Sequence, residues 1–166
     1  MKQHLSFMLH KKILSATLLL LVMLPLFCFA QSKKIPALRF TDTENTLVSN
    51  KDIPKGKALM LIYFRSDCDH CEHTAQQLKT TAAKYPVTIW MVSAEPLPTL
   101  RTFEEMMGLY DFDNLTVMQD HTQSMHRWFD FEKLPFIVLF DKSGKELKIF
   151  DELPTVETIK KILTTK

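Results

Sequence analysis

A run of apolar residues that leads directly into two closely spaced cysteines constrains the fold of this chain more than any other feature. Residues 58–64 (ALMLIYF) are continuously apolar and follow the turn-forming sequence PKG. This pattern is typical of a strand buried on both faces of a sheet. From residue 69 to residue 84 the apolar residues recur at helical spacing. Cys68 and Cys71 are therefore predicted to lie where a buried strand ends and an amphipathic helix begins.

The rest of the chain alternates between short apolar strands and amphipathic helices. Strands that alternate with helices predict a parallel sheet with helices on both faces, and a terminal hairpin adds antiparallel strands. We therefore expect an α/β fold with a central mixed sheet, a C-terminal β-hairpin and a last helix. Residues 41–57, rich in Thr, Asp and Asn, are expected to form a loop. The expected strands are residues 38–40, 58–64, 87–92, 115–118, 136–140 and 146–150, and the expected helices are residues 69–84, 98–108, 121–129 and 155–163.

Residues 1–30 have the layout of a secretory signal peptide. A basic region with three lysines precedes an apolar run that ends at the small residue Ala30. We expect cleavage after Ala30, which would leave one domain, residues 31–166, in the periplasm or another exported compartment. The alternative is an uncleaved membrane anchor through residues 13–30, a run about long enough to span a bilayer.

Removing that segment changes both the charge balance and the cysteine count. The whole chain has 21 basic and 19 acidic residues, and without the three lysines 18 basic residues remain, a net charge of −1 that gives no indication of nucleic-acid binding. Three glycines in the whole sequence are too few for a phosphate-binding loop. Cys68 and Cys71 are the cysteines that remain. Structural disulfides of exported proteins usually close longer loops, so this pair indicates redox chemistry.

The expected position of the cysteines assigns their roles. A helix N-terminus presents unpaired N–H groups and a partial positive charge, and both favour a thiolate. Cys68, at the start of the helix, is predicted to be the exposed nucleophile. Cys71, one turn further and more buried, is predicted to resolve the mixed disulfide that forms on Cys68.

Several motifs together resemble the thioredoxin-like superfamily, especially the exported thiol-disulfide oxidoreductases of the TlpA and ResA type. They are YFRSDCDHC after the apolar strand, KLPFIVLF later in the chain and a KSGK turn behind it, and the resemblance covers nearly all of residues 36–166. It implies a thioredoxin fold in which a cis peptide between Leu134 and Pro135 packs against the disulfide and shapes the groove for a client peptide. It also implies a reductant of protein disulfides that receives electrons from a membrane thiol donor. We expect a monomer without an organic cofactor or metal.

Three positions depart from the pattern of that superfamily. Asp67 stands where a tryptophan commonly precedes the first cysteine, Ile62 stands where thioredoxins carry a buried aspartate, and Leu134 replaces a common Thr or Val. The charges beside the cysteines also oppose one another. A protonated His70 would stabilise a thiolate on Cys68, as the equivalent histidine does in DsbA-like relatives, whereas Asp67 and Asp69 would destabilise it. The sequence therefore leaves the direction of electron transfer open.

Metal binding and a redox-inert binding module are the alternative functions. Zinc could be held by a Cys-x2-Cys pair with a later His-x4-His pair, and copper by cysteines and histidines of the same motif together with methionines. Zinc fingers, however, place their ligands on short hairpins and helices rather than at the end of a buried strand. The zinc set would be Cys68, Cys71, His121 and His126, and the copper set Cys68, His70, Cys71 and His73 with Met106, Met107 or Met125.

Overall fold

The computed structural model describes residues 33–165 of the chain. Within them, seven strands form one mixed sheet in the order β2-β1-β5-β4-β3-β6-β7. The strands are β1 (Arg39–Asp42), β2 (Leu47–Ser49), β3 (Ala58–Tyr63), β4 (Val87–Ser93), β5 (Leu115–Gln119), β6 (Phe136–Phe140) and β7 (Glu146–Phe150). The helices are α2 (Asp69–Thr81), α3 (Leu97–Met107), α4 (Ser124–Trp128) and α5 (Val156–Thr164), with short 3-10 helices at η2 (Asn50–Asp52) and η3 (Ala82–Lys84). The mixed α/β architecture predicted from the sequence is confirmed.

The central strand β3 brings distant parts of the chain to one edge of the sheet. It runs parallel to β4, which runs parallel to β5, so the carboxyl ends of these three strands lie together. Strand β6 pairs with β3 in the antiparallel sense, with Phe136 opposite Tyr63. The residues that precede β6 therefore lie at the same edge as the residues that follow β3.

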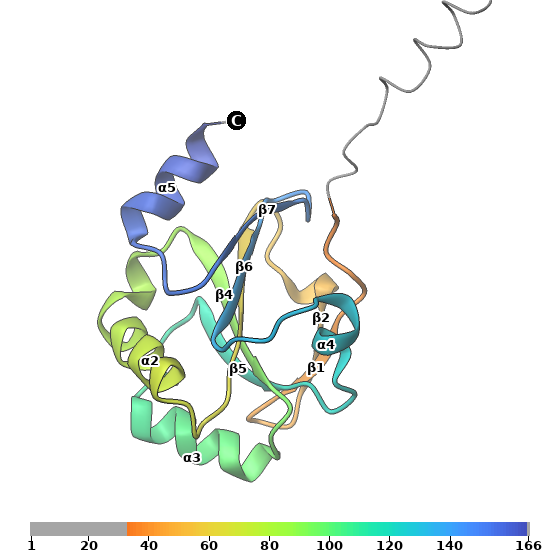
Figure 1. The fold of residues 1–166 in the computed structure, drawn as a ribbon, viewed down its shortest axis with the longest axis vertical. Coiled ribbons are helices and arrows are strands. Elements are labelled where there is room, and N and C mark those ends of the chain that lie inside the picture. The colour runs from red at the N-terminus through yellow and green to blue at the C-terminus, as the bar shows by residue number, and fades with distance from the viewer. Residues whose placement is uncertain (1–32, 166) are drawn as a thin grey trace, which may run out of the picture. The chain divides into compact units, whose positions relative to one another are not determined.

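Helices cover both faces of the sheet, as Figure 1 shows: α2, α3 and α5 lie on one side and α4 on the other. Alternate residues of β3 enter the two resulting hydrophobic cores, because successive side chains of a strand point to opposite faces. Ile62 packs with residues of α2, α3 and α5. Leu61 and Tyr63 pack on the other face with Met125 of α4 and with Leu38 and Phe40. Every residue of β3 is buried, as the continuous apolar run predicts.

The structure differs from the sequence-based expectation at two places. The expected loop after β1 contains strand β2, which pairs with β1 at the edge of the sheet. This strand is three residues long and its leucine is exposed, so the segment is too short to show an alternating pattern in the sequence. The helix expected from residue 121 begins at Ser124 instead. The buried carboxylate of Asp120 accepts hydrogen bonds from the N–H groups of Ser124 and Met125, which places the helix start after an intervening turn.

Residues 1–32 lie outside the described part, and with them the expected signal peptide and the alternative anchor at residues 13–30. Between residues 33 and 165, no helix combines the length and the apolar character needed to cross a bilayer.

Candidate active site

Cys68 is the N-cap residue of α2. Its backbone is extended, with φ −115° and ψ 114°. Its carbonyl oxygen accepts hydrogen bonds from the backbone N–H groups of Cys71 and Glu72, each with 2.9 Å between nitrogen and oxygen. The N–H of Cys71 also points at the sulfur of Cys68, with 3.3 Å between the two heavy atoms. The side chain of Cys68 therefore sits where the first N–H groups of a helix lack partners within the helix, and where negative charge is favoured.

Cys71 lies one turn into α2 and has no exposed surface. Its side chain packs in the core between α2 and the sheet, whereas Cys68 is only half-buried. Burial, followed by the hydrogen bond with Cys68, raises the pKa of the Cys71 thiol from 9.0 to about 12. Both cysteines are free, so the geometry is that of the dithiol. It pairs an accessible sulfur with a buried, protonated thiol.

The peptide bond between Leu134 and Pro135 is cis, as the resemblance implies. The antiparallel pairing of β3 and β6 brings this bond next to the cysteines. The thiol of Cys68 lies 3.9 Å from the carbonyl oxygen of Leu134, within reach of a weak S–H hydrogen bond. Pro135 is buried and Leu134 is half-buried. Their role as a groove for a client peptide stays a prediction.

The loop between β3 and α2 is held by a carboxylate that the sequence analysis did not single out. Glu95, just after β4, accepts hydrogen bonds from the backbone N–H and the hydroxyl of Ser66, both at 2.7 Å. It also accepts the hydroxyl of Ser93 at 3.0 Å. Residues that follow adjacent parallel strands meet at one sheet edge, where ligand sites of α/β folds commonly form. This rule would have indicated Glu95 as a neighbour of the cysteine loop.

The three residues expected to tune the redox pair lie on the surface around Cys68. Asp67 is exposed and forms an ion pair with Arg65, which is also exposed. Asp69 is the first residue of α2, and His70 follows it in the exposed first turn. The ion pair between Asp67 and Arg65 lies on the surface and therefore contributes little free energy. Their effect on the thiolate of Cys68 remains a prediction.

The alternative metal sites gain no support from the geometry. Among residues 33–165, no group of three or more His, Cys, Asp or Glu side chains is arranged to hold a metal ion. His126 packs instead against aromatic rings, stacked on Phe131 with 4.5 Å between ring centroids and edge-on to Tyr63 at 5.1 Å.

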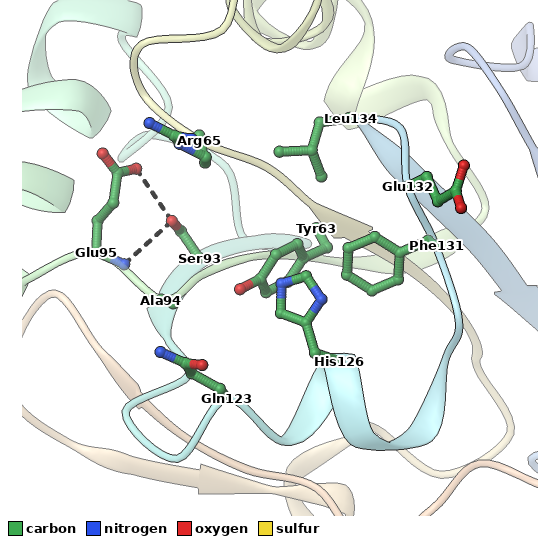
Figure 2. A pocket seen from close by; sticks show the side chains of 10 residues that line it. All are labelled: Tyr63, Arg65, Ser93, Ala94, Glu95, Gln123, His126, Phe131, Glu132 and Leu134. Carbon is green, nitrogen blue, oxygen red and sulfur yellow. Dashed lines mark hydrogen bonds between the residues drawn. The ribbon is translucent and has the colours of Figure 1, made fainter.

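A pocket of about 480 Å³ opens at the same edge of the sheet, and neither cysteine lines it. Figure 2 shows Tyr63, His126 and Phe131 gathered at its centre, with Glu95 and Glu132 at opposite sides. Leu134 lines the pocket as well, so the residue whose carbonyl contacts Cys68 also forms part of the pocket wall. No sequence pattern indicated this pocket, because its residues come from four separate segments of the chain.

The fold has many counterparts among solved structures. The thioredoxin domain of a thiol-disulfide oxidoreductase from Bacteroides vulgatus superposes with a TM-score of 0.65 at 24% identity, covering 82% of this chain and 99% of that one. A thiol:disulfide interchange protein from Chlorobium tepidum gives a TM-score of 0.61 at 18% identity, covering 82% and 97%. A secreted disulfide oxidoreductase from Mycobacterium tuberculosis gives 0.61 at 15% identity, covering 78% and 96%. These similarities show a thioredoxin-like fold.

No curated protein sequence matches the chain. The family described as Redoxin does match it, over residues 30–163, which include both cysteines, the cis peptide bond and every strand and nearly all of every helix described above. The chain therefore belongs to the Redoxin family of thioredoxin-like oxidoreductases.

Proposed function

We propose that this protein reduces disulfide bonds of client proteins in an exported compartment, with Cys68 and Cys71 as its redox pair. One observation carries the proposal: the half-buried sulfur of Cys68 caps α2 and receives the N–H of Cys71, while the thiol of Cys71 is buried behind it. An accessible nucleophile and a protected second thiol are the two parts that thiol-disulfide exchange requires.

The reaction proceeds in two exchanges. The thiolate of Cys68 attacks one sulfur of the client disulfide, forms a mixed disulfide and releases the other client sulfur, which takes up a proton. The thiol of Cys71 then loses its proton to the solvent and attacks the sulfur of Cys68. The client leaves with its second sulfur as a thiol, so it has gained two electrons and two protons. The Cys68–Cys71 disulfide that remains is reduced again by an external dithiol, for which we propose a membrane thiol donor.

The charges near Cys68 support the direction of transfer. A strong oxidant of this chemistry owes its potential to a stabilised reduced form. Here carboxylates flank the nucleophile on both sides, at Asp67 and Asp69, and the nearby cation Arg65 is engaged with Asp67. These carboxylates favour a reductant, whereas a protonated His70 would favour an oxidant, and the equilibrium potential of the cysteine pair decides between the two.

The proposed compartment rests on the apolar segment at residues 13–30, which is followed by the small residue Ala30. The secreted disulfide oxidoreductase of similar fold is consistent with it. N-terminal sequencing of the protein from a fractionated bacterial host would show whether residues 1–30 are removed and where the chain resides.

Reduction of insulin disulfides tests the activity. The measurement uses a Cys28→Ala background, so that Cys68 and Cys71 are the thiols that remain. We expect turnover by this protein, none by its Cys68→Ser variant, and a trapped mixed disulfide with its Cys71→Ser variant. Unchanged turnover after Cys68→Ser would overturn the assignment of the nucleophile.

The equilibrium potential tests the direction. Equilibration with dithiothreitol or glutathione buffers, followed by counting of free thiols, is expected to give a value near the thioredoxin value of about −270 mV. A value near that of DsbA, about −120 mV, would make the protein an oxidant.

A further inference from the structure

The pocket lined by Leu134 has an aromatic wall. Three rings pack against one another: Tyr63 lies 5.0 Å from Phe131 and 5.1 Å from His126, and His126 lies 4.5 Å from Phe131. Phe131 is supported from behind by Phe136 of β6, stacked at 4.6 Å. Tyr63 belongs to the buried central strand, so at least one ring of this wall is held rigidly. Phe131 is stacked between His126 and Phe136, and Tyr63 is 3% exposed, so the wall offers an apolar aromatic surface that can pack against the methylene groups of a long side chain.

Carboxylates give the same pocket an excess of negative charge. Glu95 and Glu132 line it, and the cation on its wall, Arg65, is paired with Asp67. Burial raises the pKa of the Tyr63 hydroxyl, and the negative charges of buried Asp120 and of Glu95 raise it further, while a hydrogen bond with the backbone of Ala94 and the positive charge of Arg65 lower it.

The pocket is also within reach of a client that is joined to Cys68. Leu134 contacts the sulfur of Cys68 through its carbonyl oxygen and lines the pocket as well. An extended peptide advances about 3.3 Å per residue, so a long side chain one or two positions from the client cysteine lies near Leu134, the residue that joins the two places.

We propose that this pocket binds a lysine or arginine side chain of the client protein, close in sequence to the cysteine that Cys68 attacks. The proposal rests on the thiol exchange proposed above and names the class of client that the protein prefers. The methylene groups of this side chain lie against the aromatic wall, and Glu95 and Glu132 supply the charge opposite to its ammonium or guanidinium group. An acidic side chain at the same position is rejected by these carboxylates.

Rates with short peptides test the preference. Each peptide carries one cysteine as a mixed disulfide with 2-thiopyridine, and attack by Cys68 releases pyridine-2-thione, whose absorbance gives the second-order rate constant. The peptides differ at one position next to the cysteine, which holds lysine, norleucine or glutamate. With the full-length Cys28→Ala protein, we expect the lysine peptide to react about three- to tenfold faster than the norleucine peptide. The glutamate peptide should be the slowest, and added salt should reduce the differences.

Two glutamate substitutions separate the pocket from the overall charge. Glu132 and Glu105 are both exposed, but Glu105 lies on α3 and does not line the pocket. Glu132→Gln should lower the ratio of the lysine rate to the norleucine rate, whereas Glu105→Gln should leave this ratio unchanged. Phe131→Leu, which keeps an apolar side chain but removes a ring of the wall, should slow the lysine and norleucine peptides alike and leave their ratio unchanged.

The outcomes separate this inference from the proposed function. Equal rates for the three peptides, or a faster glutamate peptide, would overturn the cation pocket while leaving the thiol exchange intact. An equal decrease of the lysine-to-norleucine ratio in Glu132→Gln and Glu105→Gln would assign the preference to the net charge of the protein. That result would also overturn the cation pocket. If no peptide releases more pyridine-2-thione with the Cys28→Ala protein than with its Cys68→Ser variant, the proposed function itself is refuted.

Discussion

The buried thiol of Cys71 predicts a large difference in reactivity between two cysteines only three positions apart. The perturbation is alkylation by iodoacetamide, which reacts with the thiolate. Cys68 is half-buried at the helix N-terminus, whereas Cys71 has no exposed surface and a pKa of about 12. At neutral pH we expect one thiol to be modified in the folded protein, that of Cys68.

The size of the effect follows from the pKa of Cys71. A shift from 9.0 to about 12 lowers its thiolate fraction at neutral pH about 1000-fold. Nucleophilicity rises with pKa with a Brønsted slope of about 0.4–0.5, which recovers part of the loss and leaves a decrease of about 30- to 60-fold. Burial against the core also hinders approach of the reagent, so this decrease is a lower bound relative to an ordinary thiol.

The assay is a time course of alkylation in the Cys28→Ala background, with the modified cysteine identified by peptide mass spectrometry. Unfolding in denaturant should make both thiols react at similar rates. The Cys68→Ala variant supplies a further control, because it removes the hydrogen bond with the side chain of residue 68 but keeps the burial of Cys71. Since burial is the larger cause of the raised pKa, Cys71 should remain slow in that variant.

Two results would refute this reasoning. Alkylation of Cys71 at the rate of Cys68 in the native dithiol would show that its thiol is not buried as described. Fast alkylation of Cys71 in a folded Cys68→Ala variant would show that its low reactivity comes from the neighbouring sulfur and not from burial.

Three further predictions concern stability. The free energy of unfolding of the dithiol should fall as the pH rises from about 9 towards 12, by at most about 1.4 kcal/mol per pH unit, because the pKa of Cys71 is raised in the folded state and its thiol then ionises first in the unfolded chain. Urea titrations at several pH values should show a steeper fall in the parent protein than in Cys71→Ala, because the raised pKa values of Tyr63 and Tyr85 lower stability in the same direction in both proteins. Leu78→Ala, which empties a fully buried position of α2, should cost about 2–5 kcal/mol in the same titrations, against less than about 0.5 kcal/mol for Gln76→Ala on the exposed face of that helix. Equal losses at the two positions would contradict the packing of α2. Asp120→Asn should cost about 1–3 kcal/mol and speed amide exchange in α4, because the amide cannot accept every hydrogen bond that the carboxylate accepts from Ser124 and Met125. Unchanged exchange would show that this carboxylate does not determine the start of α4.

The parts of the fold that carry a local signal could be predicted from the sequence. The apolar run of β3, the helical spacing of α2 and the cysteine pair between them are each contained in a few consecutive residues. Strand β2 had no such signal, since it is three residues long and lies at the sheet edge. The start of α4 was misplaced because a buried carboxylate at Asp120 determines it, and a charged residue gives no sign in the sequence that it will be buried.

The cis peptide bond before Pro135 was expected from the resemblance alone, and the structure confirms it. Glu95 and the aromatic pocket were missed for a different reason. Glu95 meets Ser66 across 29 positions of sequence, and this contact depends on the adjacent pairing of β3 and β4. Long-range contacts of this kind follow from topology and not from the spacing of residue types.

The strand, the cysteine pair and the helix, and with them the chemistry of the protein, follow from local sequence, because apolar periodicity and thiol spacing act over a few neighbouring residues. The surroundings of that pair depend on how the chain packs in three dimensions. Packing of α2 against the sheet buries Cys71, and the pairing of β3 with β6 places Leu134 beside Cys68. The same sheet edge gathers Tyr63, His126 and Phe131 into a pocket. These contacts join residues far apart in the chain, so they arise only when the sheet has formed.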